Sequence, residues 1–219
     1  MGRVIKLVIT VLTILTIGFF VSTGNADPIN VGDVIKLYDG PGTTGGGEFQ
    51  VYKDGVGLFN TFCLERSEFF SFGQALTVAG ISDRAIYGGT QPPPNGPGYD
   101  ELDPRTAYLY TQFRAGTLSG YNTGDDASAN ALQLAIWYIE GEWTETLTGL
   151  ALRFFKAADN SGWTDIGNVR VLNLVDSQGN RRQDQLVMVP EPSTLLLMGA
   201  GLIGIGVFGR KRFRRKGRN

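Results

Sequence analysis

Two residues of this chain have side chains whose presence calls for a chemical explanation. Cys63 is the only cysteine, so it cannot form an intramolecular disulfide, and its thiolate would be a nucleophile. Gln133 is the only polar residue in the run from Ala131 to Trp137. Burying its amide without a partner would cost about 1 to 3 kcal/mol. The amide therefore needs a partner or a chemical role.

The surroundings of these residues resemble the thioester domains of bacterial surface adhesins. In those domains a cysteine that follows an aromatic residue forms an internal thioester with a glutamine in a Thr-Gln-x-Ala-Ile-Trp helix. Phe62-Cys63-Leu64 matches the cysteine block. The helical motif is matched by Gln133, Ala135, Ile136 and Trp137.

Two further segments bear on this resemblance. Tyr108 to Tyr110 is similar to the segment between the two blocks. Leu132 stands where the adhesins usually have threonine, so another donor would have to orient the amide. The resemblance implies a thioester between Cys63 and Gln133. Its supporting shell would consist of Phe62, Ala135, Ile136 and Trp137.

Such a bond would form when the Cys63 thiolate attacks the Gln133 carboxamide and ammonia leaves. Proximity would lower the barrier, because aligned groups reach effective molarities on the order of 10⁵ M. An aromatic shell of Phe62, Trp137 and Tyr138 would exclude water, and a partner's lysine would become linked by an amide bond. The alternative is that Cys63 is a core thiol, Gln133 hydrogen-bonds a backbone group and Trp137 is simply packed.

Strands and helices must bring these two residues together. Apolar patterning predicts strands over residues 34–38, 49–53, 58–64, 168–175 and 185–189. Capping residues and apolar spacing predict helices over residues 104–114, from Asp126 or Ser128 to 139, and over about 147–158. Because strands flank a central helical section, the fold class is α+β, in a β-strand-rich single domain.

The segments between these elements also carry expectations. Gly40 to Gly47 lacks the features of a phosphate-binding loop and is interpreted as a flexible hairpin connection. Residues 88–98, rich in proline and glycine, form an exposed loop. The aromatic series Phe69, Phe70 and Phe72 is expected to be core rather than a binding surface.

Both ends of the chain have the composition of targeting segments. Residues 1–26 combine a charged start, an apolar centre and a small-x-Ala cleavage site, which indicates a signal peptide cleaved after Ala26. Residues 189–219 contain a Pro-Glu-Pro motif, an apolar helix over about 193–209 and a basic tail over 210–219. Because such a basic cluster stays cytoplasmic, the body, residues 27–188, is expected to lie outside.

The C-terminal segment closely resembles the PEP-CTERM sorting signal of Gram-negative bacteria, with Pro190, Glu191 and Pro192 as the motif. The resemblance implies an exosortase-type membrane protease as a partner. It also implies anchoring in the inner membrane through the C-terminal helix before processing, and then delivery to the cell surface or extracellular matrix. The alternative is an ordinary single-span anchor.

Charge and composition exclude several functional classes. Residues 27–188 contain 11 Lys and Arg against 20 Asp and Glu, a net charge of −9, which repels phosphate backbones, so no nucleic-acid partner is expected. The absence of histidine excludes a hydrolase that uses histidine and a His-ligated metal site, and no cofactor is expected. A hydrolase based on paired carboxylates would use Glu65 and Glu68 or Glu140 and Glu142, but these acids are expected to be solvated.

Together these features predict an exported, exosortase-sorted protein of the cell surface or extracellular matrix. It would attach covalently to an extracellular polysaccharide or a surface protein amine through an internal Cys-Gln thioester. Such a protein is not an enzyme, because the bond forms once. The alternative is a non-covalent structural component of the exopolysaccharide layer without a thioester.

Overall fold

Strands occupy both ends of the described chain and helices its middle. The computed structural model describes residues 27–43, 45–86 and 100–189. The elements are β1 (Val34–Asp39), β2 (Phe49–Lys53), β3 (Val56–Thr61), β4 (Leu76–Ser82), β5 (Arg84–Ala85), β6 (Asp100–Glu101), α2 (Pro104–Arg114), α3 (Asp126–Ile139), α4 (Gly149–Asp159), β7 (Val169–Val175) and β8 (Arg181–Met188). The predicted strand-rich fold with a central helical section is confirmed.

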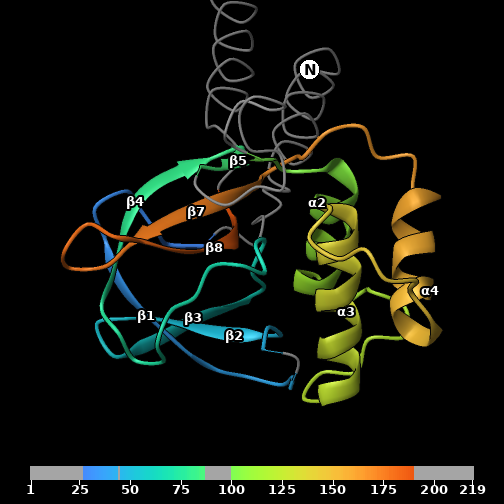
Figure 1. The fold of residues 1–219 in the computed structure, drawn as a ribbon, viewed down its shortest axis with the longest axis horizontal. Helices are drawn as coiled ribbons and strands as arrows, with labels where there is room; N and C mark the ends of the chain where they lie inside the picture. Colours follow the sequence, from blue (N-terminus) through green and yellow to red (C-terminus); the bar gives the residue numbers. More distant parts are fainter. Residues whose placement is uncertain (1–26, 44, 87–99, 190–219) are drawn as a thin grey trace, which may run out of the picture.

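Most strands belong to one antiparallel sheet, in the order β3-β2-β1-β4-β7-β8 (Figure 1). The two ends of this sheet meet just after β3. There Leu186 N donates to Phe62 O at 3.0 Å, and Leu64 N donates to Asp184 O at 3.2 Å. Cys63 pairs with Gln185 between them as an isolated antiparallel bridge. The sheet therefore curls until the segment that follows its first strand pairs with its last strand, which covers part of both edges.

The curled sheet encloses an apolar cluster of its own. In β1, Ile35 and Leu37 are buried while Val34 and Lys36 are exposed, as expected from the two-residue period of a strand. The buried members of the cluster are Ile29, Ile35, Leu37, Val51, Phe59, Leu76, Val78, Leu172, Leu174 and Val187. A second, larger cluster lies between the helices and the sheet, and most of its members come from α2, α3 and α4.

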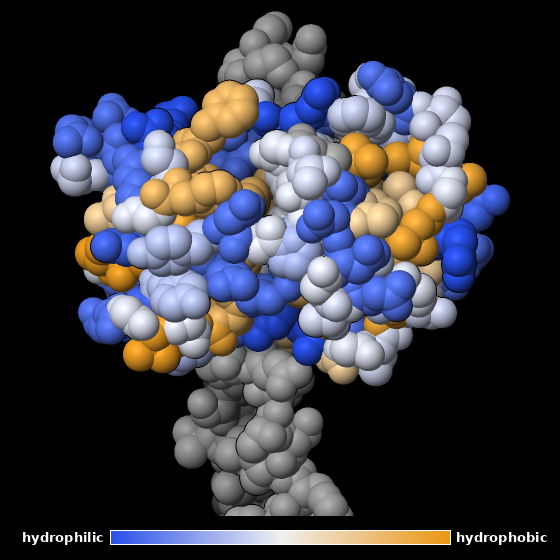
Figure 2. Space-filling model, turned by 90° about the horizontal axis from the view of Figure 1, so that it is seen from below, coloured by the Kyte–Doolittle hydropathy of each residue, from blue (hydrophilic) through white to orange (hydrophobic). Residues whose placement is uncertain are grey.

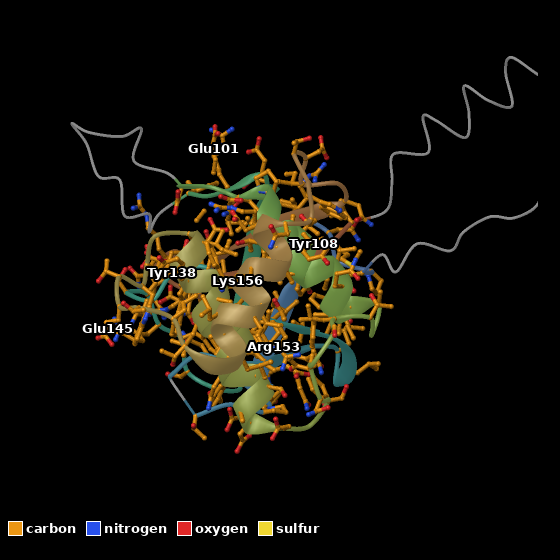
Figure 3. The ribbon with its side chains drawn as sticks, turned by 90° about the vertical axis from the view of Figure 1, so that its right-hand side faces the viewer. Glu101, Tyr108, Tyr138, Glu145, Arg153 and Lys156 are labelled. Atoms are coloured by element: carbon orange, nitrogen blue, oxygen red, sulfur yellow. The ribbon has the colours of Figure 1, made fainter. Side chains whose placement is uncertain are left out.

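The helix α2 begins at the cap that the sequence predicts, whereas the N-cap of α3 is Asp125, one residue before the earlier of the two predicted starts. Asp103 Oδ1 accepts a hydrogen bond from Arg105 N at 2.8 Å, with Pro104 as the first helical residue of α2. Asp125 Oδ2 accepts from Ser128 N at 2.9 Å at the start of α3. The three helices stand side by side next to the strands, and α4 is the outermost layer (Figures 1 and 3).

Tyr110 of α2 ties the helices to the seam where the sheet closes. Its hydroxyl lies 3.0 Å from Asn60 O and 3.2 Å from Leu186 O, which belong to β3 and β8. Arg114, one turn later, donates to the same hydroxyl at 3.0 Å. The seam that contains Cys63 is thus held in place from the helical side.

Three expectations about local structure are wrong. The central strand β4 was not predicted, because a bulge between Val78 and Gly80 interrupts its alternation. The strand β8 begins at Arg181, four residues earlier than predicted. Phe69 and Phe72 are not core residues, since 69% and 54% of their surfaces are exposed. Phe70 alone of that series is partly buried.

The targeting segments lie beyond what the structure describes. The predicted signal peptide over residues 1–26, the loop over 88–98, the motif at 190–192, the membrane helix over about 193–209 and the basic tail over 210–219 all fall outside the described residues. Within the described residues, no helix has the length and hydropathy needed to span a membrane.

Candidate thioester site

Cys63 occupies the seam of the curled sheet. The strand β3 ends at Thr61, two residues before Cys63, although the sequence predicted a strand through residue 64. The main chain nevertheless stays extended enough for Cys63 to pair with Gln185. Its side chain is fully buried, so the thiol is shielded from water on all sides.

Gln133 reaches this thiol from α3. Its side chain is also fully buried, and Cys63 Sγ lies 3.3 Å from Gln133 Oε1. Because a carbonyl carbon lies about 1.23 Å from its oxygen, the sulfur is within about 4.5 Å of the amide carbon. The structure thus brings together the two residues that the sequence singled out, near the separation needed for attack.

Three backbone groups hold the Gln133 amide. Its Oε1 accepts hydrogen bonds from Gly47 N at 3.2 Å and from Cys63 N at 3.3 Å. Its Nε2 donates to Cys63 O at 2.9 Å. These contacts orient the amide without any hydroxyl group at position 132, which is a leucine. The two N–H groups on one oxygen form the arrangement that stabilises negative charge in an acyl-transfer intermediate.

The glycine-rich loop between β1 and β2 supplies one of these donors. It connects two antiparallel strands as predicted. Its backbone is also hydrogen-bonded to one face of α3: Gly42 N donates to Asp126 Oδ1 at 2.9 Å, and Thr43 N donates to Asn130 Oδ1 at 2.7 Å. With Gly47 N on Gln133, the loop is aligned along successive turns of the helix.

Close packing explains why glycine is needed next to this donor. A Cβ at Gly46 would lie 2.6 Å from two ring carbons of Trp137 and 3.0 Å from Gln133 Cγ. The backbone at Gly46 therefore packs directly on the indole. Any larger residue would displace either the ring or the loop that carries Gly47 N.

Aromatic residues cover the thiol, but they are not all the predicted ones. Cys63 packs in one cluster with Trp137 and Phe49, and the partly buried Phe70 and Trp143 pack against it. Trp137 thus belongs to the shell as predicted. Phe49, Phe70 and Trp143 were missed, because no local pattern connects them to Cys63.

The other residues predicted as a shell lie on the helical side. Phe62, Ala135 and Ile136 are buried, but they belong to the cluster between the helices and the sheet. Phe62 makes an edge contact with Phe113, whose ring centroid is 5.0 Å away. Tyr138 is partly exposed and contacts Phe155 of α4 (Figure 3). The role of these residues is to pack α3 against its neighbours.

Burial raises the pKa of the Cys63 thiol well above its usual range, and the nearby Glu65 and Glu142 carboxylates act in the same direction. The Trp137 indole N–H acts in the opposite direction. This N–H makes no conventional hydrogen bond in the described part of the chain. The thiolate is therefore scarce at neutral pH, and proximity must compensate for that.

The acids expected to be solvated are in part buried. Glu65 is buried, its Oε2 accepts from Asp184 N at 3.0 Å, and burial together with Asp184 raises its pKa. Burial raises the pKa of Glu140 to about 8. Glu68 and Glu142 are only half buried. A buried acid can remain neutral, and a sequence pattern does not show which acids do so. No group of three or more metal-ligating residues occurs among the described residues.

Comparison with known families identifies the C-terminal segment. Residues 189–215 match the PEP-CTERM protein-sorting motif. No curated protein and no solved structure matches the chain. A PEP-CTERM motif implies export, processing by an exosortase at the membrane, and then a location at the cell surface or outside the cell.

The PEP-CTERM segment begins where the described body ends. Val189 follows the last residue of β8, Met188, whose carbonyl accepts a hydrogen bond from Asp27 N at 2.7 Å. Asp27 also forms a bidentate ion pair with Arg114, with both N–O distances 2.8 Å. The predicted signal-peptide junction and the start of the PEP-CTERM segment therefore lie side by side.

Proposed function

We propose that this PEP-CTERM protein attaches covalently to a partner through a thioester between Cys63 and Gln133. The observation that carries the proposal is the 3.3 Å contact between Cys63 Sγ and Gln133 Oε1, together with the two N–H groups on that oxygen. A buried thiol and a buried amide pack together without reacting in many cores. Here the amide is polarised at the atom that would receive negative charge.

The bond would form in one displacement. The Cys63 thiolate attacks the Gln133 amide carbon, and the charge that develops on Oε1 is stabilised by Gly47 N–H and Cys63 N–H. The bond between the amide carbon and nitrogen breaks, and ammonia leaves with the proton that the thiol has lost. The complete burial of both side chains protects the thioester from hydrolysis.

A primary amine of the partner would then resolve the thioester. Its nitrogen bonds to the former Gln133 carbonyl carbon, the bond from that carbon to sulfur breaks, and the thiol regains a proton. The product is a stable amide between the two molecules. Because the bond forms once, we propose that the protein is an attachment protein rather than a turnover enzyme.

The sorting tail supplies the cellular setting of this proposal. We place the protein in the inner membrane of a Gram-negative bacterium before processing, and afterwards at the surface or in the extracellular matrix. Replacing Pro190, Glu191 and Pro192 with alanine is expected to leave the protein in the membrane fraction with its tail attached. Release to the surface by this variant would contradict the proposed reading of the motif.

The covalent step is tested by mass spectrometry of the purified protein. The wild type is expected to be lighter by one ammonia than its sequence, and to gain one methylamine when that amine is added. Cys63→Ala and Gln133→Ala are each expected to have full sequence mass and to add no methylamine. A wild type of full sequence mass that adds no methylamine, and whose Cys63 is alkylated once the protein is unfolded, would overturn the covalent proposal in favour of a non-covalent component of the exopolysaccharide layer.

A further inference from the structure

A patch of exposed phenylalanines adjoins the buried thiol. Phe69 and Phe72 are mostly exposed. The ring of Phe72 lies 5.8 Å from that of Phe70 and 6.1 Å from that of Phe49, between centroids. Phe49 in turn packs on Cys63. The exposed Phe72 ring is thus connected to Cys63 through Phe49.

A pocket of about 420 Å³ lies at one side of this patch, lined by Arg66, Ser67, Phe69 and Glu142. Arg66 follows Cys63 by three residues, and Glu142 N donates to Trp137 O at 2.8 Å, so both walls are continuous with the site. The charge of Glu142 also acts on the Cys63 thiol. The pocket is therefore within electrostatic reach of the sulfur.

The pocket is lined by one base, Arg66, and one acid, Glu142, and burial raises the pKa of Glu142 while the charge of Arg66 acts to lower it. The Arg66 guanidinium is stacked over the Trp143 ring, 4.6 Å from its centroid, which directs its charge toward the indole. Glu142 Oε2 accepts one hydrogen bond, from Arg66 N at 3.2 Å. Its carboxylate retains further acceptor positions for an ammonium group. The net charge of −9 over residues 27–188 attracts cations in the same way.

Resting on the proposed thioester, we infer that this patch and pocket are the docking surface for a lysine-bearing segment of a partner protein. The lysine stem lies along Phe69, its ammonium pairs with Glu142, and neighbouring apolar side chains of the segment cover Phe72. Sugars offer aromatic rings a stacking surface as well, but their hydroxyl groups are neutral and give Glu142 no charge partner. Figure 2 shows hydrophobic side chains over the strand side of one face, separated by hydrophilic ones from those over the helical side.

The test compares two amines that differ in their reach. Methylamine is too small to touch the patch, whereas acetyl-Phe-Lys-Phe-amide carries a lysine between two aromatic residues. In the wild type the peptide is expected to add to the thioester about tenfold faster than methylamine, which corresponds to about 1.4 kcal/mol of docking. Phe69→Ala and Phe72→Ala should each reduce this ratio toward one. Both residues are exposed, so the fold should tolerate the changes.

Val56→Ala is the matched control, because Val56 is an equally exposed apolar residue on β3 that does not line the pocket. It should leave the peptide-to-methylamine ratio as in the wild type. A ratio that is the same in Phe69→Ala and in the wild type would overturn the docking surface while leaving the thioester intact. Failure of methylamine to add to the wild type would instead sink the proposed function.

A second measurement tests the surface without the thioester. Cys63→Ala should bind the same peptide reversibly, and Glu142→Gln in that background should weaken binding about tenfold while preserving the acceptor for Arg66 N. Cellohexaose serves as the competing ligand. Binding of the sugar in place of the peptide, with loss of sugar binding in Phe69→Ala, would overturn the inference and identify a carbohydrate site.

Discussion

Two buried glutamines flank Cys63, and only one of them has its carbonyl oxygen polarised. Gln133 Oε1 accepts two backbone hydrogen bonds and lies 3.3 Å from the sulfur. Gln185, the residue paired with Cys63 across the seam, donates from its Nε2 to Gln183 O at 3.3 Å. Within the described residues its Oε1 has no hydrogen-bond partner. Burial near a thiol is thus common to both, while donors on the oxygen distinguish them.

This difference follows from what surrounds each amide. Gln133 projects from a helix toward the glycine-rich loop and the main chain of Cys63, where Gly47 N and Cys63 N donate to its oxygen. Gln185 lies within a strand, where the backbone N–H groups are used by neighbouring strands. A carbonyl without donors would carry the charge of a tetrahedral intermediate unaided, at a cost of several kcal/mol. The comparison therefore predicts that Cys63 reacts with Gln133 and not with Gln185.

The largest expected effect on the mass deficit comes from replacing the side-chain amide of Gln133 or Gln185 by a group that cannot release ammonia. Gln133→Glu should abolish both the mass deficit and the addition of methylamine, because the carboxylate is not attacked by a thiolate. Gln185→Met should retain both properties, since it removes an amide whose oxygen is unpaired. Intact mass spectrometry of the two variants distinguishes them. If the mass deficit were lost in Gln185→Met and kept in Gln133→Glu, Gln185 rather than Gln133 would be the partner of Cys63.

A smaller effect on thioester formation is expected from moving Gly47 N, which donates a hydrogen bond to Gln133 Oε1. In Gly46→Ala the added methyl would overlap Trp137, so the loop that carries Gly47 N must shift. Misplacement by about 1 Å costs about 100-fold in rate, and thioester formation during refolding should slow accordingly. Gly55→Ala is the control for a general loss of stability: its φ of +78° strains an alanine, but the added methyl would meet no atom within 4 Å and the residue lies in another turn. Equal rates for the two variants would argue against the role of Gly47.

The surroundings of Gln185 should also make stability depend on pH. Burial raises the pKa of Asp184 to about 7, above its unfolded value, so its contribution is complete at acid pH and is lost as the pH rises through 7. The share of this loss due to Asp184 is on the order of 3 kcal/mol between pH 5 and pH 9. Urea unfolding at these two pH values measures it. Asp184→Asn should reduce the dependence without abolishing it, because burial also raises the pKa of Glu65 and Glu140. Glu145→Gln, at an exposed acid (Figure 3), should preserve the dependence.

The smallest effect on the reaction is expected from Leu132→Thr, which introduces a hydroxyl group next to Gln133. The Gln133 amide already has three backbone hydrogen bonds, so the added hydroxyl should change neither the mass deficit nor the rate of methylamine addition. The variant should lose about 2 kcal/mol of stability, because Leu132 is fully buried in the core. A marked increase in thioester content would show that the backbone donors are not sufficient.

The sequence determined much of the local structure because local rules govern it. Asp103 and Pro104 marked the start of α2, and the apolar spacing from Leu132 to Ile139 marked α3. Alternation identified β1, β2 and β7. Each of these signals depends on residues a few positions apart, which interact whatever the rest of the chain does.

Other features depend on contacts that no local pattern records. The strand β4 has a bulge that interrupts its alternating pattern, so the sequence does not identify it as a strand. Its place in the centre of the sheet is evident only from its pairing with β1 and β7. The exposure of Phe69 and Phe72 and the burial of Glu65 and Glu140 likewise depend on which surfaces meet. An aromatic residue is compatible with a core or a surface, and a neutral acid can be buried. Residue type alone therefore predicted neither the exposure of the phenylalanines nor the burial of the acids.

For the candidate site, the sequence determined which residues could react, and the tertiary structure decided whether they meet. A lone cysteine and a glutamine within an apolar helix are visible in the chain itself. Their contact requires the sheet to close at the seam, α3 to cross it, and Gly47 to approach from 86 residues away in sequence. Because hydrogen-bond donors act over about 3 Å, only the packing of these distant segments could place them on the Gln133 oxygen.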